Sequence, residues 1–340
     1  MIAFLSISLS TAIASLALPL SILIANKLGI LDKPNQAHKS HVKPVPYLGG
    51  MAILVSSFVG YFLTSRIINF PNSGEFLLLA LVASVSISMI GFFDDLKPRG
   101  AVFRLVAQTI IVLAGCASLS YSERLRINLF ENNFYNFLIL SFFMLSVCNF
   151  VNMFDNHDGS ASGVSFWILT YIAILATLNS QTFVQSLALS ICSSTLIFVF
   201  WNFPPAKIYL GDAGSTFLGF AIAFLMVQLD FRELSSFESC VGLVIALGML
   251  ELDFCVAVIS RLRRGLSPMQ GDQAHTAHRL KRLGLRKWQV TLLIWLITIW
   301  FIFLSSIVLI FDSIPNNPAI ILAAVSFFGL LTFFLKQSDV

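Results

Sequence analysis

The sequence has few charged residues. They make up 11% of its 340 residues, against about 25% in a typical soluble domain, while 57% are hydrophobic and the mean hydropathy is +0.86. This composition excludes an ordinary water-soluble domain. It also excludes a disordered chain, which combines high charge with low hydrophobicity. The five cysteines lie in apolar stretches without a C-x-x-C pair, so a disulfide scaffold is excluded as well. The class of protein that remains is a helical protein that crosses a membrane several times.

Eleven apolar stretches are long enough to span a bilayer as helices, which takes about 20 residues. They are residues 2–25, 48–66, 76–93, 103–121, 135–151, 164–180, 183–203, 213–229, 238–259, 288–311 and 318–335. The first stretch lacks the basic leader of a secretory signal, because no Lys or Arg precedes Lys27, so we expect it to be retained as a span. The sequence predicts an all-α, polytopic membrane protein with about eleven transmembrane helices in one domain, residues 1–340.

Basic residues are concentrated in the loops that follow the odd-numbered spans. Seventeen of the 21 Lys and Arg residues lie there or in the C-terminal tail, and the opposite side has only Arg66, Arg124, Arg126 and Arg232. Cytoplasmic loops are enriched in Lys and Arg, so we expect the N-terminus outside and the C-terminus in the cytoplasm. The cytoplasmic face then has the loops 26–47, 94–104, 152–163, 204–212 and 260–287.

All five histidines and seven of the aspartates also lie on this predicted cytoplasmic side. They are His38, His41, His157, His275, His278, Asp32, Asp94, Asp95, Asp155, Asp158, Asp212 and Asp272. Topology signalling requires only Lys and Arg. The concentration of these other groups therefore indicates a site that combines metal ligands, acid–base groups and phosphate-binding groups.

Two acidic motifs indicate a metal. Asp94 and Asp95 end the third span, and adjacent carboxylates at a membrane boundary repel each other unless a hard cation such as Mg²⁺ offsets the repulsion. Asp212 stands in G-D-A-G-S at the start of a span, where glycines beside a helix N-terminus present N–H groups to an anion. The alternatives are a solvated helix end for the pair and an N-capping role for Asp212.

Two further motifs suit a nucleotide diphosphate. Asn152, Asp155 and Asp158 recur at every third residue, so a helical turn would place them on one side, unless the segment is an Asn/Asp-rich turn. The last inner loop has eight basic residues, and its His275 and His278 are one helical turn apart. Arginines there could clamp a diphosphate. A patch that binds anionic lipid and, with less support, a zinc site are the alternatives.

Two carboxylates lie inside the ninth span. Glu251 and Asp253 are functional candidates because charged groups within a membrane are costly. Asp253 lies near the same helical face as Arg261, so we expect it to reach the site at the inner face. Glu251 points elsewhere and has no assigned role.

The motifs, in this order, resemble those of the polyprenyl-phosphate N-acetylhexosamine-1-phosphate transferases, the glycosyltransferase-4 family of bacterial cell-envelope synthesis. The resemblance extends from about residue 30 to residue 283. Its five motifs are D-x-P-N…H…K-P-x-P-x-x-G-G at 32–50, G-x-x-D-D with Arg104 and Gln108 following, N-x-x-N-x-x-D-x-x-D-G at 149–159, N-x-x-P-A-K-x-x-x-G-D-A-G-S at 202–215, and R-R-G-x-x-P…D-x-x-H-x-x-H-R-L at 263–280.

The resemblance implies transfer of a sugar-1-phosphate, by default GlcNAc-1-phosphate, from a UDP-sugar to undecaprenyl phosphate, which gives undecaprenyl-diphospho-sugar and UMP. It implies Mg²⁺ as the cofactor, with Mn²⁺ as a substitute. It places the enzyme in the bacterial inner membrane with its site facing the cytoplasm, at the start of a cell-envelope glycan such as O antigen. No nucleic-acid partner is expected, and a homodimer is left open. A polyprenyl-lipid flippase and an inactive scaffold are the alternative functions.

The motifs and the resemblance together give a set of site residues. Asp212 and Asp94 are the expected metal ligands. The expected catalytic residues are Asp94, Asp95, Asp155, Asp158, His275 and His278, and the expected substrate-binding residues are Asn152, Asn202, Lys43, Arg104, Arg279 and Asp253. The chain also departs from the family pattern. Asn156 and His157 stand where Gly-Leu is common, Ser160 stands where Leu is common, and Ala277 replaces a second adjacent histidine.

Overall fold

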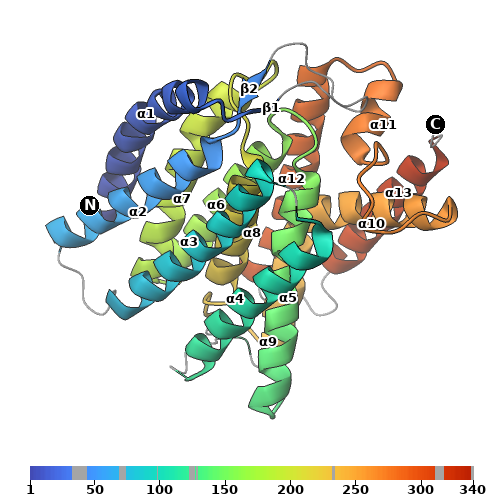
Figure 1. Ribbon diagram of the computed structural model, residues 1–340. Helices are drawn as coiled ribbons and strands as arrows, with labels where there is room; N and C mark the ends of the chain where they lie inside the picture. The colour runs from blue at the N-terminus through green and yellow to red at the C-terminus, as the bar shows by residue number, and fades with distance from the viewer. Residues whose placement is uncertain are drawn as a thin grey trace.

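The computed structural model describes residues 1–32, 44–68, 74–97, 99–121, 127, 129–231, 234–310 and 318–337 (Figure 1). Its helices are α1 (Ile2–Leu28), α2 (Gly49–Ile68), α3 (Gly74–Leu96), α4 (Ala101–Tyr121), α5 (Asn133–Phe154), α6 (Ser160–Leu178), α7 (Thr182–Asn202), α8 (Gly211–Met226), α9 (Ser236–Ala246), α10 (Gly248–Arg263), α11 (Thr276–Arg282), α12 (Lys287–Ile310) and α13 (Pro318–Lys336). Two short antiparallel strands, β1 (Leu31–Asp32) and β2 (Val45–Pro46), pair before α2.

The eleven predicted spans are all helical, but two of them are not simple spans. Within the described residues, nine helices are long and apolar enough to cross a bilayer, namely α1 to α7, α12 and α13. The predicted span 213–229 is the 16-residue helix α8. The predicted span 238–259 is the pair α9 and α10, which are bent by 67° relative to each other. Counting the pair as one span gives ten, so the chain is an all-α, multi-pass membrane protein with fewer full-length spans than the sequence predicted.

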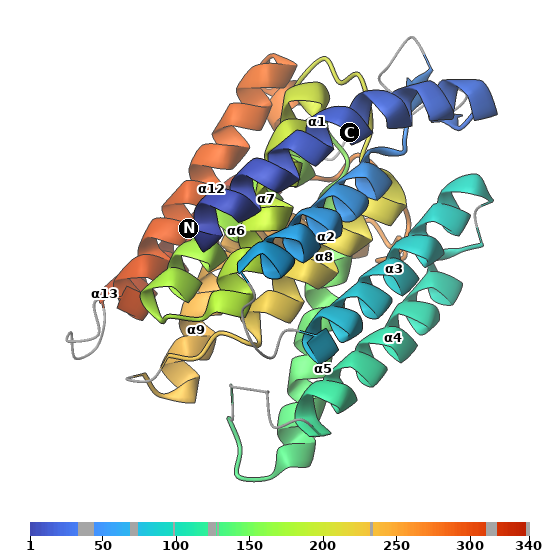
Figure 2. The same cartoon turned by 90° about the vertical axis from the view of Figure 1, so that its left-hand side faces the viewer.

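Helix α8 is apolar because it forms the centre of the protein. Sixteen residues give a helix of about 24 Å, which is shorter than the hydrocarbon core of a bilayer, about 30 Å. Every residue from Ala213 to Met226 is buried, and α2, α3, α5 and α6 contact the helix. Figures 1 and 2 show α8 in the interior of the bundle. Hydropathy alone cannot distinguish such a buried helix from one that faces lipid.

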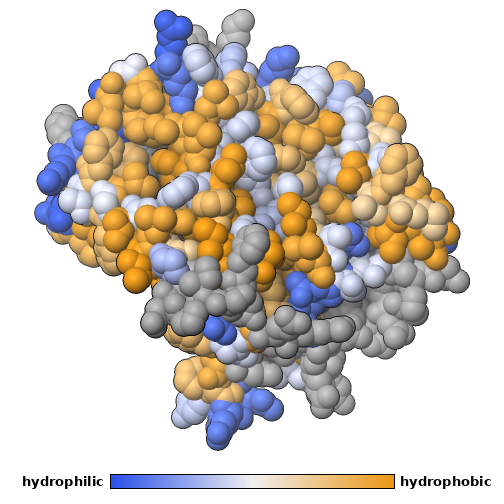
Figure 3. All heavy atoms as spheres, turned by 180° about the vertical axis from the view of Figure 1, so that it is seen from behind, coloured by the Kyte–Doolittle hydropathy of each residue, from blue (hydrophilic) through white to orange (hydrophobic). Residues whose placement is uncertain are grey.

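The outer surface of the bundle is apolar. Phe4, Leu16, Phe142, Phe200 and Ile321 are among the exposed large hydrophobic residues, and Figure 3 shows hydrophobic side chains spread over the visible face. An apolar surface of this extent would promote association in water but is suited to contact with lipid chains. The surface therefore agrees with the membrane setting that the composition indicates.

A close contact between α2 and α8 positions the start of α8. The backbone N–H groups of Gly49 and Gly50 donate to the carbonyl oxygens of Tyr209 and Leu210, at 3.1 and 3.0 Å. A Cβ atom on Gly50 would collide with the backbone of Gly214. Glycine is therefore needed where the two helices begin. This contact fixes the N-terminal turn of α8, which carries Asp212.

Replacing Gly50 by alanine is expected to lower the stability of the folded protein. The added methyl group has no flexible neighbour that can move aside, and overpacking of this kind costs about 1–3 kcal/mol or more. Gly115→Ala is the matched control, because Gly115 also lies within a helix but has open space where a Cβ would be. Thermal unfolding in detergent should show a lower midpoint for Gly50→Ala and an equal or higher midpoint for Gly115→Ala. Equal midpoints for Gly50→Ala and the unmodified protein would contradict this account of the contact.

Candidate active site

One cavity of about 610 Å³ lies at the end of the bundle where β1, β2 and α11 are found (Figure 1). Its walls come from all five loops that the sequence placed on one side of the membrane. The lining residues are Asp32, Tyr47, Asp94, Asp95, Asp155, Asn156, His157, Asp158, Asn202, Tyr209, Gly211, Asp212, Gly271, Asp272, Gln273, His275, His278, Lys281 and Lys287. Segments that are far apart in the sequence therefore converge on a single polar cavity.

Asp212 lies in the first turn of α8 and is held through both carboxylate oxygens. Asn152 of α5 donates its side-chain N–H to Oδ1 at 3.0 Å and to Ser215 Oγ at 2.8 Å. Arg104 of α4 donates to Oδ2 of Asp212 and, at 3.1 Å, to Oδ2 of Asp94. Asn152 and Arg104 are thus arranged around the acidic groups and are not among the residues that line the cavity.

Asp95 caps helix α8. Its carboxylate accepts hydrogen bonds from the backbone N–H groups of Asp212 and Ala213, at 3.1 and 3.3 Å. A carboxylate at this position satisfies N–H groups that have no partner within the helix and interacts favourably with the helix dipole. N-capping was the alternative role that the sequence left open for Asp212, but the capping carboxylate belongs to Asp95, which comes from α3.

Asp155 and Asp158 lie in the turn between α5 and α6. Helix α5 ends at Phe154 and Gly159 has a left-handed φ of 73°, so the continuous helical turn expected through Asp158 is wrong. The chain bends after Asp155, and both carboxylates still line the cavity. Burial, with the added repulsion of Asp212, Asp95 and Asp158, raises the pKa of Asp155 to about 8. Burial is the larger cause and the repulsion adds to it, so without a cation the Asp155 carboxyl is largely protonated at neutral pH.

Asn202 connects three segments beneath the cavity floor. Its Oδ1 accepts from the Gly159 backbone N–H and from Ser162 Oγ, both at 2.9 Å, and its Nδ2 donates to the Ile208 carbonyl oxygen at 2.9 Å. The side chain is buried, and both of its polar atoms are used. Asn202 therefore lines the cavity and also holds α6, α7 and the 204–212 loop together. Its expected contact with a nucleotide stays a prediction.

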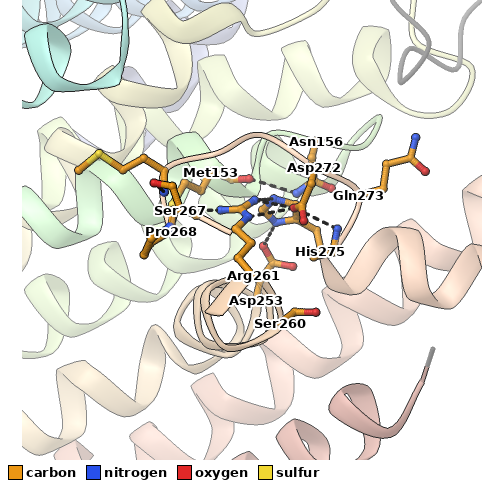
Figure 4. Close-up of polar contacts among 12 residues, drawn as sticks. Met153, Asn156, Asp253, Ser260, Arg261, Ser267, Pro268, Asp272, Gln273 and His275 are labelled. Carbon is orange, nitrogen blue, oxygen red and sulfur yellow. Dashed lines mark hydrogen bonds and ion pairs between the residues drawn. The ribbon is translucent and has the colours of Figure 1, made fainter. Parts of the chain in front are cut away.

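A network of buried hydrogen bonds holds His275, which directly precedes α11, against Asp253 and Arg261 of α10 (Figure 4). Asp253 Oδ2 lies 2.7 Å from Nδ1 of His275, and Arg261 lies 3.0 Å from Nε2. Because arginine can only donate, Nε2 accepts and Nδ1 carries the proton that it donates to Asp253. Asp253 Oδ1 also accepts from Thr276 at the start of α11. Both ring nitrogens of His275 are therefore hydrogen-bonded. His275 lines the cavity, whereas Asp253 does not line it and contacts a lining residue instead.

Asp272 joins the same network from the loop before α11. It accepts from Arg261 at 3.0 Å and from Arg264. Although burial acts to raise it, the hydrogen bonds from Arg264 and Arg261 lower the pKa of Asp272. Asp272 thus bridges the two arginines, and these ion pairs hold the loop that carries His275.

His278, Lys281 and Lys287 form the basic wall of the cavity. Burial, together with the charges of Lys281 and of His275, lowers the pKa of His278 to about 4, so His278 is neutral at neutral pH. Lys287 Nζ lies 3.6 Å from Oδ2 of Asp158. From the sequence, both lysines belonged to the basic loop that suits a diphosphate, but neither was named as a site residue. The available signal was spacing, since Lys281 follows His278 by three residues and shares its helix face.

Arg279 does not reach the cavity, which corrects the expectation that it binds substrate. The side chain is fully buried and donates to the carbonyl oxygens of Ala274, Phe334 and Gln337 at 2.7–2.8 Å, and to Ser260 Oγ at 2.6 Å. It follows His278 directly on a helix, so the two side chains point in different directions. Arg279 joins α11 to the end of α13. Lys43, the remaining expected site residue, lies outside the described residues.

Replacing Arg279 by methionine is expected to destabilise the protein by about 2–4 kcal/mol, because several buried carbonyl groups lose their donor. The midpoint of thermal unfolding in detergent should fall. Binding of a nucleotide ligand to the protein that remains folded should be unchanged. A loss of nucleotide binding without a fall in the midpoint would restore the substrate-binding role for Arg279.

The carboxylates that line the cavity are suitable ligands for a divalent cation. Within the described part of the chain, no three His, Cys, Asp or Glu side chains are arranged as ligands around one point, and Arg104 bridges Asp94 and Asp212. Seven carboxylates nevertheless line the cavity against two lysines. Carboxylate oxygens are the ligands that Mg²⁺ takes, and it binds through one or two of them together with substrate phosphates. A full protein cage is therefore not required.

Comparison with known proteins agrees with the resemblance in the motifs. Residues 77–230 match the profile of glycosyl transferase family 4. A probable undecaprenyl-phosphate N-acetylglucosaminyl 1-phosphate transferase of Bacillus subtilis (strain 168) is 32% identical over 292 residues, covering 84% of this chain and 79% of the relative. Undecaprenyl-phosphate alpha-N-acetylglucosaminyl 1-phosphate transferases of Escherichia coli (strain K12) and Salmonella typhi are 25% and 27% identical, covering 80% of this chain and 74% of each relative.

Proposed function

Because this chain belongs to glycosyl transferase family 4, we propose that it transfers GlcNAc-1-phosphate from UDP-GlcNAc to undecaprenyl phosphate, with release of UMP. The observation that carries the proposal is the division of the cavity. The carboxylates of Asp94, Asp95, Asp155 and Asp212 form one group, since they share partners or repel one another, and this group is the acidic side. His278, Lys281 and Lys287 form a second group, the basic side, whose members affect one another electrostatically. A cavity of this kind can hold a metal ion and a diphosphate next to each other.

The reaction brings together two anions. An oxygen of the lipid phosphate attacks the β-phosphorus of the UDP-sugar, the bond between that phosphorus and the bridging oxygen breaks, and UMP leaves. A phosphate monoester is largely ionised near neutral pH, since its second pKa is about 6, so the attacking oxygen needs little help from a base. Neutralising and aligning the phosphates is the larger task.

The acidic residues would hold Mg²⁺, with Mn²⁺ as a substitute. Asp212 and Asp94 are the proposed ligands, in place of the Arg104 guanidinium that now bridges them. When bound, the ion would neutralise charge on the phosphates and orient them. Asp95 holds the first turn of α8 in place, so that Asp212 is presented to the cavity. A bound cation would lower the pKa of Asp155, which would then add negative charge to this part of the cavity.

The basic residues would bind the diphosphate. Lys281 and Lys287 supply charged donors from two different helices, and His278 can add a neutral donor or acceptor between them. His275 is a positioning residue in this proposal, because both ring nitrogens are already hydrogen-bonded. Asp253 and Arg261 in turn fix its ring.

The apolar exterior of the bundle is consistent with an acceptor substrate that is anchored in the membrane. An undecaprenyl chain lies in the bilayer, and its phosphate must meet a water-soluble nucleotide at the membrane surface. The cavity lies at the end of the bundle, and its loops are the ones that the distribution of Lys and Arg assigns to the cytoplasm. We therefore place the reaction at the cytoplasmic face of the bacterial inner membrane, where it would start a cell-envelope glycan.

The proposal is tested with purified protein, undecaprenyl phosphate, Mg²⁺ and a panel of UDP-sugars. UMP release should be greatest with UDP-GlcNAc and should require the lipid. Absence of UMP with every sugar would favour an inactive scaffold, and movement of lipid between leaflets without UMP would favour a flippase.

Removal of divalent ions is expected to stop UMP release. Without a cation, the acidic side of the cavity repels both phosphates. Chelation with EDTA should abolish activity, and excess Mg²⁺ or Mn²⁺ should restore it. Full activity after chelation would show that Arg104 and the lysines suffice, and the metal would then have no part in the account.

A further inference from the structure

His157 carries an unpaired acceptor in the wall of the cavity. The residue is only 7% exposed, and its Nδ1 lies 3.0 Å from the carbonyl oxygen of Asp158. A carbonyl oxygen only accepts, so Nδ1 carries the proton and donates it. The ring is neutral, because burial, with Lys281, lowers the pKa of His157 to about 4. The lone pair therefore lies on Nε2, which is buried and has no hydrogen-bond partner among the described residues.

Asn156 carries a second acceptor of the same kind. Its Nδ2 donates to the carbonyl oxygen of Met153 at 3.1 Å, so Oδ1 is the atom left for another partner. That oxygen is also buried without a partner in the part of the chain that the structure describes. Asn156 and His157 both line the cavity.

A third unpaired polar group lies close by in the sequence. Ser160, at the start of α6, has a buried hydroxyl that also lacks a partner among the described residues. Native proteins pair nearly all buried polar groups, because an unpaired one loses its hydration without compensation. Apolar residues at these positions would avoid this penalty. The polar residues therefore indicate a partner that arrives with a ligand.

We propose that Asn156 and His157 form an acceptor pair that binds an N–H or O–H group on the nucleoside or sugar of the donor substrate. This inference rests on the proposed function. The diphosphate and the lipid phosphate present oxygens that themselves accept hydrogen bonds. Uracil has an N–H group, ribose and the sugar have hydroxyl groups, and the N-acetyl group has an amide N–H. Lys281 and Lys287 lie close enough to affect His157 electrostatically, so the pair lies beside the proposed diphosphate site.

The test uses His157→Leu and Asn156→Gly, each of which removes one of the two acceptors. The dissociation constant for UDP-GlcNAc, measured by calorimetry without lipid, should rise about tenfold for each variant, because a hydrogen bond to a buried acceptor is lost. KM for UDP-GlcNAc should rise in parallel, and KM for undecaprenyl phosphate should not change. His157→Gln, which can place an acceptor near the former Nε2, should recover part of the loss.

Two further measurements locate the partner and control for structural effects. If the dissociation constant for UMP rises by the same factor, the pair binds the nucleoside; if it is unchanged, the pair binds the sugar. Ser165→Ala is the matched control, since Ser165 Oγ is also buried and unpaired among the described residues but does not line the cavity. It should leave both constants unchanged.

Unchanged affinity for UDP-GlcNAc in both cavity variants would overturn the inference. So would an equal loss for both substrates together with a lower unfolding midpoint, which indicates a structural role. These outcomes are distinct from failure of the proposed function, which is absence of UMP release by the unmodified protein with every donor.

Discussion

Replacing Asp212 by alanine is expected to reduce UMP release about a thousandfold or more. Asp212 contacts the α4 and α5 side chains at the centre of the acidic side, and it is one of two proposed ligands of the metal. Removal of a group that stabilises the transition-state charge commonly costs a factor of 10²–10³, and loss of the metal would add to that. Steady-state UMP release at saturating substrates measures the effect.

Two controls separate this effect from misfolding. Asp212→Asn preserves side-chain volume and the hydrogen bond from Asn152, so it should fold normally and still be inactive. Asp230→Asn changes an aspartate beyond the opposite end of α8 and should retain activity. Activity of Asp212→Asn within tenfold of the unmodified protein would show that the charge of Asp212 is dispensable, and the proposed metal site would be wrong.

Replacing both Lys281 and Lys287 by alanine is expected to raise KM for the UDP-sugar about a hundredfold. Each lysine should contribute about tenfold, because a charge-assisted hydrogen bond to phosphate stabilises the complex by about 1.5–3 kcal/mol. Because both lysines would contact the same diphosphate and they repel each other, the effect of the double variant need not equal the product of the single effects. Initial rates at varied UDP-GlcNAc concentration give KM for each single variant and for the pair.

Arg282→Ala is the matched control for the lysines. Arg282 lies on α11 next to Lys281, is exposed, and is not among the residues that line the cavity. Its removal changes the charge of the helix by the same amount and should leave KM for the donor within about twofold. An equal effect of Arg282→Ala and Lys281→Ala would mean that general charge, and not contact with the diphosphate, governs donor binding.

The convergence of the loops could be predicted from the sequence. Lys and Arg are sorted by topology, and the aspartates and histidines of the site lie in the same loops, so these groups had to lie at one end of the bundle. Asp94, Asp155, Asp212 and His278 do share one cavity. Their convergence required no knowledge of how the helices pack.

The packing of the apolar helices could not be predicted in the same way. Helix α8 and the pair α9–α10 have the composition of spans, but α8 is a buried core helix and α10 bends away from α9. Figure 1 shows α10 lying across the direction of α12. Hydropathy measures the free energy of transferring a side chain from water into an apolar medium. A protein core and a lipid bilayer are both apolar, so hydropathy cannot distinguish them.

The roles of individual side chains depend on partners from distant segments. Asp95 caps α8, Asn202 ties three segments together, and Arg279 anchors the end of α13. His275 has no free ring nitrogen because Asp253 and Arg261 flank it. A motif indicates that such residues belong to the site, but only the tertiary contacts distinguish a residue that faces the cavity from one that supports it.

The most direct test of the central claim is the fate of the β-phosphate of the donor. Purified protein is incubated with undecaprenyl phosphate, Mg²⁺ and UDP-GlcNAc that carries ³²P only at the β-position, and the lipid and nucleotide products are separated. We expect the label to enter the lipid as undecaprenyl-diphospho-GlcNAc and the released UMP to be unlabelled. Label in released UDP, with the sugar alone on the lipid, would show attack at the sugar carbon and would contradict the account.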